Sequence, residues 1–126
     1  MTPEDSIKLI HADCQDISTE IGTKSIDLIL CDLPYGITSN KWDSVIPIKW
    51  LWGWYDRILK PNGVIALTAS QPFSSALVMS NLCMFRHEWI WIKNRGSNFA
   101  NTVREPFKEH ESVLIINKCK KEPGLD

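Results

Sequence analysis

The stretch Ser25-Ile26-Asp27-Leu28-Ile29-Leu30-Cys31-Asp32-Leu33-Pro34-Tyr35-Gly36 decides the fold expected of this chain. Residues 26–31 are almost continuously apolar, which is typical of a parallel β-strand that is covered on both faces. Ligands of open α/β sheets bind outside the carboxyl ends of the strands. Asp32, Leu33, Pro34 and Tyr35, which follow the strand directly, are therefore the first candidates for a functional site.

Strand and helix patterns alternate on either side of this stretch. We expect strands at residues 7–11, 26–31, 64–69, 88–93 and 112–117, and helices at residues 16–21, 44–60 and 71–82. This alternation predicts an α/β sandwich around a mostly parallel sheet. The last strand follows its predecessor without a helix, so we expect it to be antiparallel. A polar segment of about eighteen residues separates these two strands, and a loop of that length in a compact domain is usually functional or mobile.

Composition limits the class of protein. The chain has 126 residues, the size of a single domain spanning 1–126, with 44% hydrophobic and 23% charged residues. The formal net charge is −1, so any contact with nucleic acid needs a local cationic patch. No apolar stretch is as long as a membrane span, and the N-terminus lacks a signal-peptide pattern. We expect a cytoplasmic protein without membrane contact.

The cysteines predict neither a metal site nor disulfides. Cys14, Cys31, Cys83 and Cys119 are far apart and form no Cys-x-x-Cys pair. The histidines do not combine with them at the spacing of metal ligands, so we expect no metal. Cysteines within apolar runs are typical of reduced thiols in an intracellular core.

Several motifs together resemble the DNA amino-methyltransferases with an Asp-Pro-Pro-Tyr signature, especially the adenine-N6 methylases of phages and prophages. The motifs that carry the resemblance are residues 10–14, 25–36, 41–43, 59–63, 70–73, 89–93 and 110–111. They cover the chain from about residue 8 to residue 118, in family order. The resemblance implies a Rossmann-like fold that binds S-adenosylmethionine, double-stranded DNA as the substrate, and a role such as restriction-modification.

The chemistry of this family explains the residue types in the central motif. An exocyclic amino nitrogen is a weak nucleophile, because its lone pair is delocalised into the ring. Two acceptors that hold its hydrogens favour the geometry in which the nitrogen can attack a sulfonium methyl group. The resemblance assigns these acceptors to the Asp32 side chain and the Leu33 carbonyl, with Tyr35 stacking on the flipped base. Leu33 stands where the signature usually has a proline. It still supplies the backbone carbonyl, but the backbone loses the rigidity that a proline gives.

The resemblance also assigns residues outside the central motif. Asp13 and Cys14, together with Asp32, correspond to cofactor contacts, although Asp13 could equally be a solvated loop carboxylate. Trp42 is a candidate lid over the site. Lys93, Arg95, Asn98 and Phe99 belong to the loop that would lie near the target base and its phosphates, where cations position the DNA without reading its sequence. A solvated mobile loop is the alternative.

Two elements of a complete methyltransferase are missing from the sequence. There is no G-x-G turn of the kind that binds the cofactor, and no target-recognition region. We therefore expect the catalytic half of a truncated enzyme, with little or no activity of its own. The strand at residues 27–31 would lack its usual neighbour, which predicts a homodimer through an exposed sheet edge or a rearranged first strand.

Other functions remain open. Methylation of cytosine N4 uses the same amino chemistry, and aspartate at position 32 favours adenine only by family habit. Methylation of cytosine C5 is disfavoured, because its nucleophilic cysteine typically follows a proline and no Pro-Cys occurs. A catalytically dead remnant that acts as a binding module is a further alternative. An unrelated nucleotide-binding domain is disfavoured by the lack of a phosphate-binding glycine loop.

Overall fold

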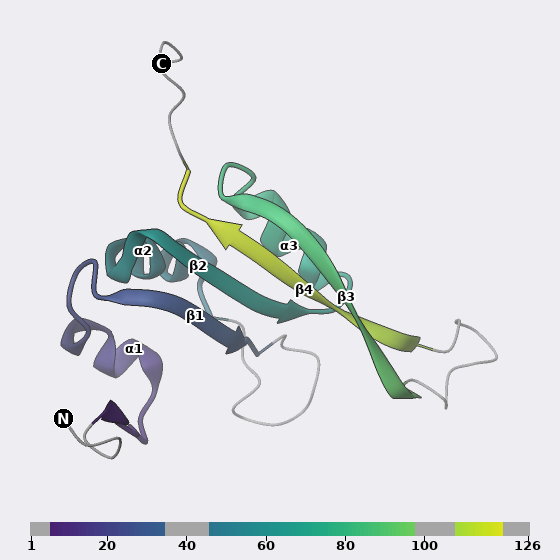
Figure 1. Ribbon diagram of the computed structural model, residues 1–126, viewed down its shortest axis with the longest axis horizontal. Helices are drawn as coiled ribbons and strands as arrows, with labels where there is room; N and C mark the ends of the chain where they lie inside the picture. Colours follow the sequence, from purple (N-terminus) through teal and green to yellow (C-terminus); the bar gives the residue numbers. More distant parts are fainter. Residues whose placement is uncertain (1–5, 35–45, 98–107, 120–126) are drawn as a thin grey trace, which may run out of the picture.

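A computed structural model describes residues 6–34, 46–97 and 108–119. The elements are α1 (Cys14–Ile17), the 3₁₀ turn η2 (Ser18–Glu20), β1 (Ile26–Asp32), α2 (Ile48–Ile58), β2 (Leu59–Ala69), α3 (Phe73–Ser80), β3 (Phe85–Ser97) and β4 (Lys108–Asn117). The strands form one twisted sheet, with α2 and α3 behind it in Figure 1. The expected α/β class is confirmed.

The sheet has the strand order β1-β2-β4-β3. β1 pairs parallel with β2, whereas β4 pairs antiparallel with both β2 and β3. The antiparallel last strand is therefore confirmed, and β1, β2 and β3 all run in the same direction. The expected "mostly parallel" pairing is wrong, because β4 lies between β2 and β3 and only β1 and β2 pair in parallel. The result is a mixed four-stranded sheet.

One face of the sheet, here called the inner face, is covered by both longer helices. Ile65, Leu67 and Ala69 of β2 are 0% exposed, and they alternate along the strand with residues of the opposite face. Leu51 of α2 and Leu77 of α3 belong to the same buried cluster. The two helices are joined by a hydrogen bond of 2.8 Å from Trp52 Nε1 to Ser80 Oγ. The core therefore lies between this helix pair and the two central strands.

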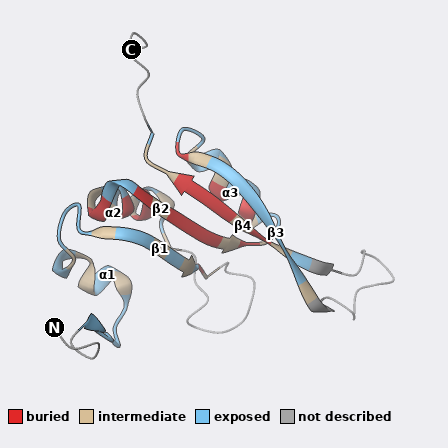
Figure 2. Cartoon of the chain, in the orientation of Figure 1, coloured by how far each residue is buried: buried red, intermediate tan, exposed pale blue. Residues whose placement is uncertain are grey.

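The opposite face of the sheet, the outer face, carries exposed apolar side chains. Leu28 and Leu30 of β1 are 55% and 72% exposed, and Trp89 and Trp91 of β3 are 62% and 51% exposed. Figure 2 shows burial concentrated on the central strands and exposure along β1 and β3. The expectation that residues 26–31 are covered on both faces is therefore wrong within the described residues, because α2 and α3 both cover the inner face.

The first expected strand, at residues 7–11, is not present. This segment has no regular structure and is exposed, with Ile7 at 71% and Leu9 at 92%. A strand needs a neighbour to satisfy its backbone groups, and no described strand pairs with this segment. The expected short helix at residues 16–21 is observed as α1 followed by η2, ending at Glu20.

The other elements are present with shifted ends. α2 is shorter than the expected helix at residues 44–60, because β2 begins directly after it at Leu59 and includes the Pro-Asn-Gly stop signal. α3 is shorter than the expected helix at residues 71–82. β3 and β4 are longer than expected and extend from both ends into the predicted long loop. None of the described helices is long and apolar enough to cross a membrane.

The expectation of reduced cysteines is wrong for two of the four. Cys83 and Cys119 form a disulfide, with their Cα atoms 5.4 Å apart, and both residues are exposed rather than in the core. Cys83 precedes β3 and Cys119 follows β4, so the antiparallel pairing of these strands brings the two residues together. Cys14 and Cys31 are free thiols.

Candidate functional site at the carboxyl end of β1

Asp32 is the last residue of β1 and lies beside Thr68 of β2 in the parallel register. The Thr68 hydroxyl donates a hydrogen bond of 2.6 Å to Asp32 Oδ1. Asp32 is exposed and belongs to the outer face, the same side of the sheet as Leu28 and Leu30. The chain thus presents an accessible carboxylate, fixed by a neighbouring strand, where ligands of α/β sheets bind.

Leu33 anchors the motif in the core. It is 5% exposed and belongs to the cluster that also contains Leu51 and Leu67. Burial of the Leu33 side chain restrains the backbone at the position where the family signature has a proline. Pro34 is half-buried. Tyr35 and Trp42 lie outside the described residues, so their expected roles at the base stay predictions.

An apolar cavity of about 440 Å³ lies beside β1 and α2. Its lining combines the start of α1, most of β1 with the two residues that follow it, and one side of α2. The residues that line it are Cys14, Ile21, Ile26, Leu28, Ile29, Leu30, Cys31, Leu33, Pro34, Ile46, Leu51, Trp54, Tyr55 and Ile58. The structure therefore brings three predicted site residues together, namely Cys14, Leu33 and Pro34. Asp13 and Asp32 are not among the lining residues.

The polar atoms of this cavity are neutral. Burial raises the pKa of the Cys14 thiol, and the neighbouring Asp13 carboxylate raises it further. Burial also raises the pKa of Cys31, although a hydrogen bond with Tyr55 acts in the opposite direction. The pKa of Tyr55 is raised mainly by burial. Both thiols and the phenol therefore stay protonated near neutral pH, and neither thiol is prepared as a nucleophile.

Asp13 has a structural role at the start of α1. Its carboxylate Oδ1 accepts a hydrogen bond of 2.9 Å from the Gln15 backbone N–H, and the residue is the N-cap of the helix. This cap fixes the position of Cys14, which immediately follows it. The cofactor contact expected of Asp13 stays a prediction.

The described lining fits part of S-adenosylmethionine. A volume of about 440 Å³ lies within the range of small-molecule sites, and apolar walls suit a flat purine ring. The lining residues include no charged side chain for the amino-acid end of the cofactor. The residues described at this cavity could therefore hold the apolar part of the molecule, with its charged part lying elsewhere.

Two of the residues predicted to contact DNA lie in the described part of the chain, and two strands separate them from Asp32. Lys93 and Arg95 are on β3, at the far side of the sheet from β1. Lys93 Nζ forms an ion pair of 2.9 Å with Glu111 Oε1 of β4, so its charge is compensated within the hairpin. Asn98 and Phe99 lie outside the described residues.

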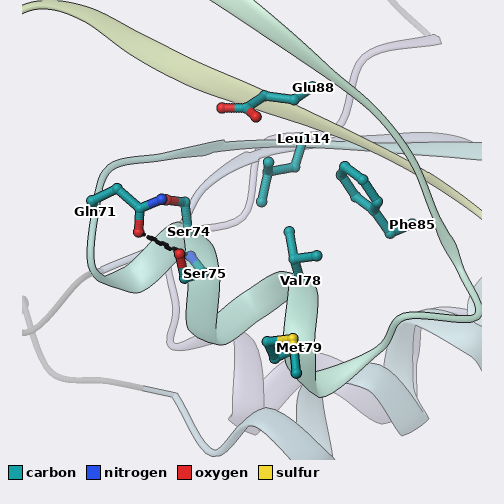
Figure 3. A pocket seen from close by; sticks show the side chains of 8 residues that line it. All are labelled: Gln71, Ser74, Ser75, Val78, Met79, Phe85, Glu88 and Leu114. Carbon is teal, nitrogen blue, oxygen red and sulfur yellow. Dashed lines mark hydrogen bonds between the residues drawn. The ribbon is translucent and has the colours of Figure 1, made fainter.

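A second cavity, of about 290 Å³, lies between α3 and the strands β3 and β4 (Figure 3). Gln71 Oε1 accepts a hydrogen bond of 2.6 Å from Ser75 Oγ at its rim. Ser74 Oγ, in a residue only 4% exposed, has no hydrogen-bond partner among the described residues. On the wall opposite α3, Glu88 accepts a hydrogen bond from the Ser112 hydroxyl. None of these residues was predicted as a site residue, although residues 70–73 are part of the family resemblance.

Two residues that support the β1 site were missed from the sequence. The apolar pattern of residues 64–69 places Thr68 within a buried strand, and a hydroxyl near the end of such a strand is the signal that could have identified it. Arg57 of α2 donates hydrogen bonds to the carbonyls of Ile21, at 2.9 Å, and Ser18, at 2.7 Å. These bonds tie the segment after Cys14 to α2.

Comparison with known proteins identifies the fold. No family model matches the chain. A crystal structure of M1.HpyAVI in complex with SAM (S-adenosylmethionine) matches with a TM-score of 0.62 and 20% sequence identity. A second crystal structure of M1.HpyAVI matches with a TM-score of 0.60 and 22% identity. Each match covers 92% of this chain, which spans 61% and 62% of the two matched chains. The chain therefore shares about three fifths of that α/β fold.

Proposed function

We propose that this chain is the catalytic segment of a DNA methyltransferase that transfers a methyl group from S-adenosylmethionine to the N6 atom of adenine. The observation that carries the proposal is the place of Asp32. Its carboxylate ends β1, is held by Thr68, and directly precedes the buried Leu33. The sequence resemblance and the fold shared with a protein crystallised with SAM support the same function.

The chemistry of this site follows from two acceptors. Oδ1 of Asp32 is held by the Thr68 hydroxyl. This bond orients the carboxylate, whose other oxygen would accept one hydrogen of the target amino group. The Leu33 carbonyl would accept the second hydrogen, and its position depends on the burial of the Leu33 side chain. When bound, the cofactor supplies an electrophilic methyl group. In this proposal Tyr35 stacks on the flipped base, which offsets part of the cost of flipping.

Double-stranded DNA is the proposed substrate, and the cytoplasm the proposed location. The chain has a net charge of −1, so attraction to phosphates depends on local cations. Lys93 is already paired with Glu111. We therefore propose that Lys93 helps to position the DNA by interacting with a phosphate as well as with Glu111. In this proposal Arg95, Asn98 and Phe99 belong to the same DNA-binding surface of the protein. Restriction-modification and prophage contexts suit an enzyme of this kind.

The alternatives differ in the base methylated or in the loss of activity. Cytosine N4 methylation needs the same two acceptors, so Asp32 and Leu33 are equally compatible with it. Cytosine C5 methylation needs a thiolate, and the raised pKa values of Cys14 and Cys31 argue against one. A remnant that acts only as a binding module would retain the fold without affinity for the cofactor.

Isothermal titration with S-adenosylmethionine tests the proposal. We expect the purified chain to bind the cofactor weakly, because the described cavity accommodates only part of it. We expect Asp32→Ala to abolish binding, because the proposal makes Asp32 a cofactor contact at the end of β1, outside the residues that line the cavity. Asp56→Ala, which removes an exposed carboxylate from α2, should leave binding unchanged. The absence of binding at millimolar cofactor would contradict the proposal and favour the remnant. Equal binding by both variants would contradict the proposed role of Asp32.

A further inference from the structure

The free edge of β3 is exposed and apolar. β3 pairs with β4 on one side, and no other strand of the described residues pairs with it (Figure 1). Four consecutive apolar residues of β3 are exposed: Trp89 at 62%, Ile90 at 55%, Trp91 at 51% and Ile92 at 76%. Proteins usually protect such an edge with charges, proline or a bulge, because it invites pairing with another strand. These four positions hold no such residue.

The exposure extends to both faces of the strand. Trp89 lies opposite Val113 and belongs to the outer face, as does Trp91. Ile90 and Ile92 belong to the inner face, where Ile90 lies opposite Ser112. A partner that packed flat on the sheet would cover only one of these pairs. A strand added to the edge of β3 would contact side chains on both faces, since its own side chains alternate in the same way.

We propose that β3 pairs antiparallel with β3 of a second copy of this chain, joining two four-stranded sheets across a two-fold axis. An antiparallel strand pair is self-complementary, because each copy presents the same residues in reverse order. Residues that lie opposite each other share a face of the sheet. The tryptophans of one copy therefore lie opposite outer-face side chains of the other copy. The isoleucines lie opposite inner-face side chains.

The charges at the ends of the apolar segment favour a second copy over an unrelated strand. Glu88 precedes the four apolar residues and Lys93 follows them. Reversal of direction places Glu88 of one copy at the same end of the interface as Lys93 of the other. Glu88 belongs to the inner face and Lys93, paired with Glu111, to the outer face, so the two charges balance at each end without forming an ion pair. The six-residue segment has no net charge, so two copies do not repel each other. One strand pair makes a small interface, which predicts a dimer that dissociates on dilution.

This interface differs from the one expected from the sequence. The sequence predicted a homodimer through the edge of residues 27–31. In β1, the exposed leucines, Leu28 and Leu30, both belong to the outer face, while Ile29 and Cys31 on the inner face pack against the core. The edge of β3 is exposed and apolar on both faces. The inference about β3 depends on these exposures and holds whether or not the chain binds S-adenosylmethionine.

Sedimentation velocity of the full chain over a range of concentrations tests the proposal. We expect a monomer–dimer equilibrium whose dissociation constant rises about tenfold or more in Trp89→Lys and in Ile92→Lys, one from each face. Met79→Lys on α3 and Leu30→Lys on β1 introduce the same charge at exposed apolar positions, 68% and 72% exposed, and should leave the dimer intact. Ile92→Thr, which keeps a β-branched side chain, should weaken the dimer if the lysine variant does not fold.

Three outcomes would overturn the proposal. The first is a chain that stays monomeric at every concentration. The second is a dimer that withstands substitution at both Trp89 and Ile92. The third is a dimer weakened by Trp89→Lys and Leu30→Lys but not by Ile92→Lys or Ile92→Thr, which would place the contact on the outer face. Circular dichroism of each variant separates loss of pairing from loss of folding.

Discussion

Leu67→Ala lowers the free energy of unfolding by about 2–5 kcal/mol, the usual cost of truncating a buried leucine. Leu67 is 0% exposed and lies in the middle of the sheet, beside Cys31 of β1 and Leu114 of β4. Removal of three side-chain carbons leaves a cavity that this rigid arrangement cannot fill. Small domains are stable by roughly 5–15 kcal/mol, so the variant would lose a large part of its stability.

Urea denaturation followed by circular dichroism measures this loss. Leu30→Ala is the matched control, because Leu30 is on the adjacent strand but 72% exposed. It should change the free energy of unfolding by no more than about 0.5 kcal/mol. Equal effects of the two substitutions would mean that the inner face of β2 is not the core of the molecule.

Arg57→Met is expected to release the segment that carries Cys14. The Arg57 guanidinium donates to the carbonyls of Ile21 and Ser18 and also lies 3.3 Å from Thr23 Oγ1. Hydrogen bonds of a charged group contribute about 1.5–3 kcal/mol each, and partial exposure of Arg57 reduces this. We expect a loss on the order of 2 kcal/mol, because methionine keeps the apolar stem and removes the donors.

Hydrogen exchange reports this release directly. Amides of residues 14–25 should exchange faster in Arg57→Met, while those of β2 and β4 stay protected. Lys49→Met removes an exposed cation from the same helix and serves as the control. Unchanged exchange in residues 14–25 would show that other contacts hold this segment, and that Arg57 does not position the cavity wall.

The sequence predicted the strand that carries the candidate site but not the surroundings of that strand. The apolar run at residues 26–31 identified β1, and the motif lies at its carboxyl end as expected. The same run is compatible with coverage on one face or two, so the exposure of Leu28 and Leu30 could not be predicted from it. The prediction of a strand at residues 7–11 was wrong, because an apolar pattern does not show whether another strand is available to pair with it.

Long-range arrangement accounts for the other differences. The antiparallel direction of β4 followed from the lack of a helix before it, but its insertion between β2 and β3 depends on packing across the whole sheet. That insertion also brings Cys83 and Cys119 together from 36 residues apart. The bond from Thr68 to Asp32 likewise joins two strands whose register no local pattern specifies.

Hydrogen exchange of the full chain with and without S-adenosylmethionine tests most directly the claim that the functional site lies at the carboxyl end of β1. The account predicts that the cofactor slows exchange in residues 14–17 of α1 and 31–33 at the end of β1, and that Asp32→Ala abolishes this protection. Protection confined to residues 73–80 of α3, or to the β3–β4 hairpin, would contradict the claim and move the site away from Asp32.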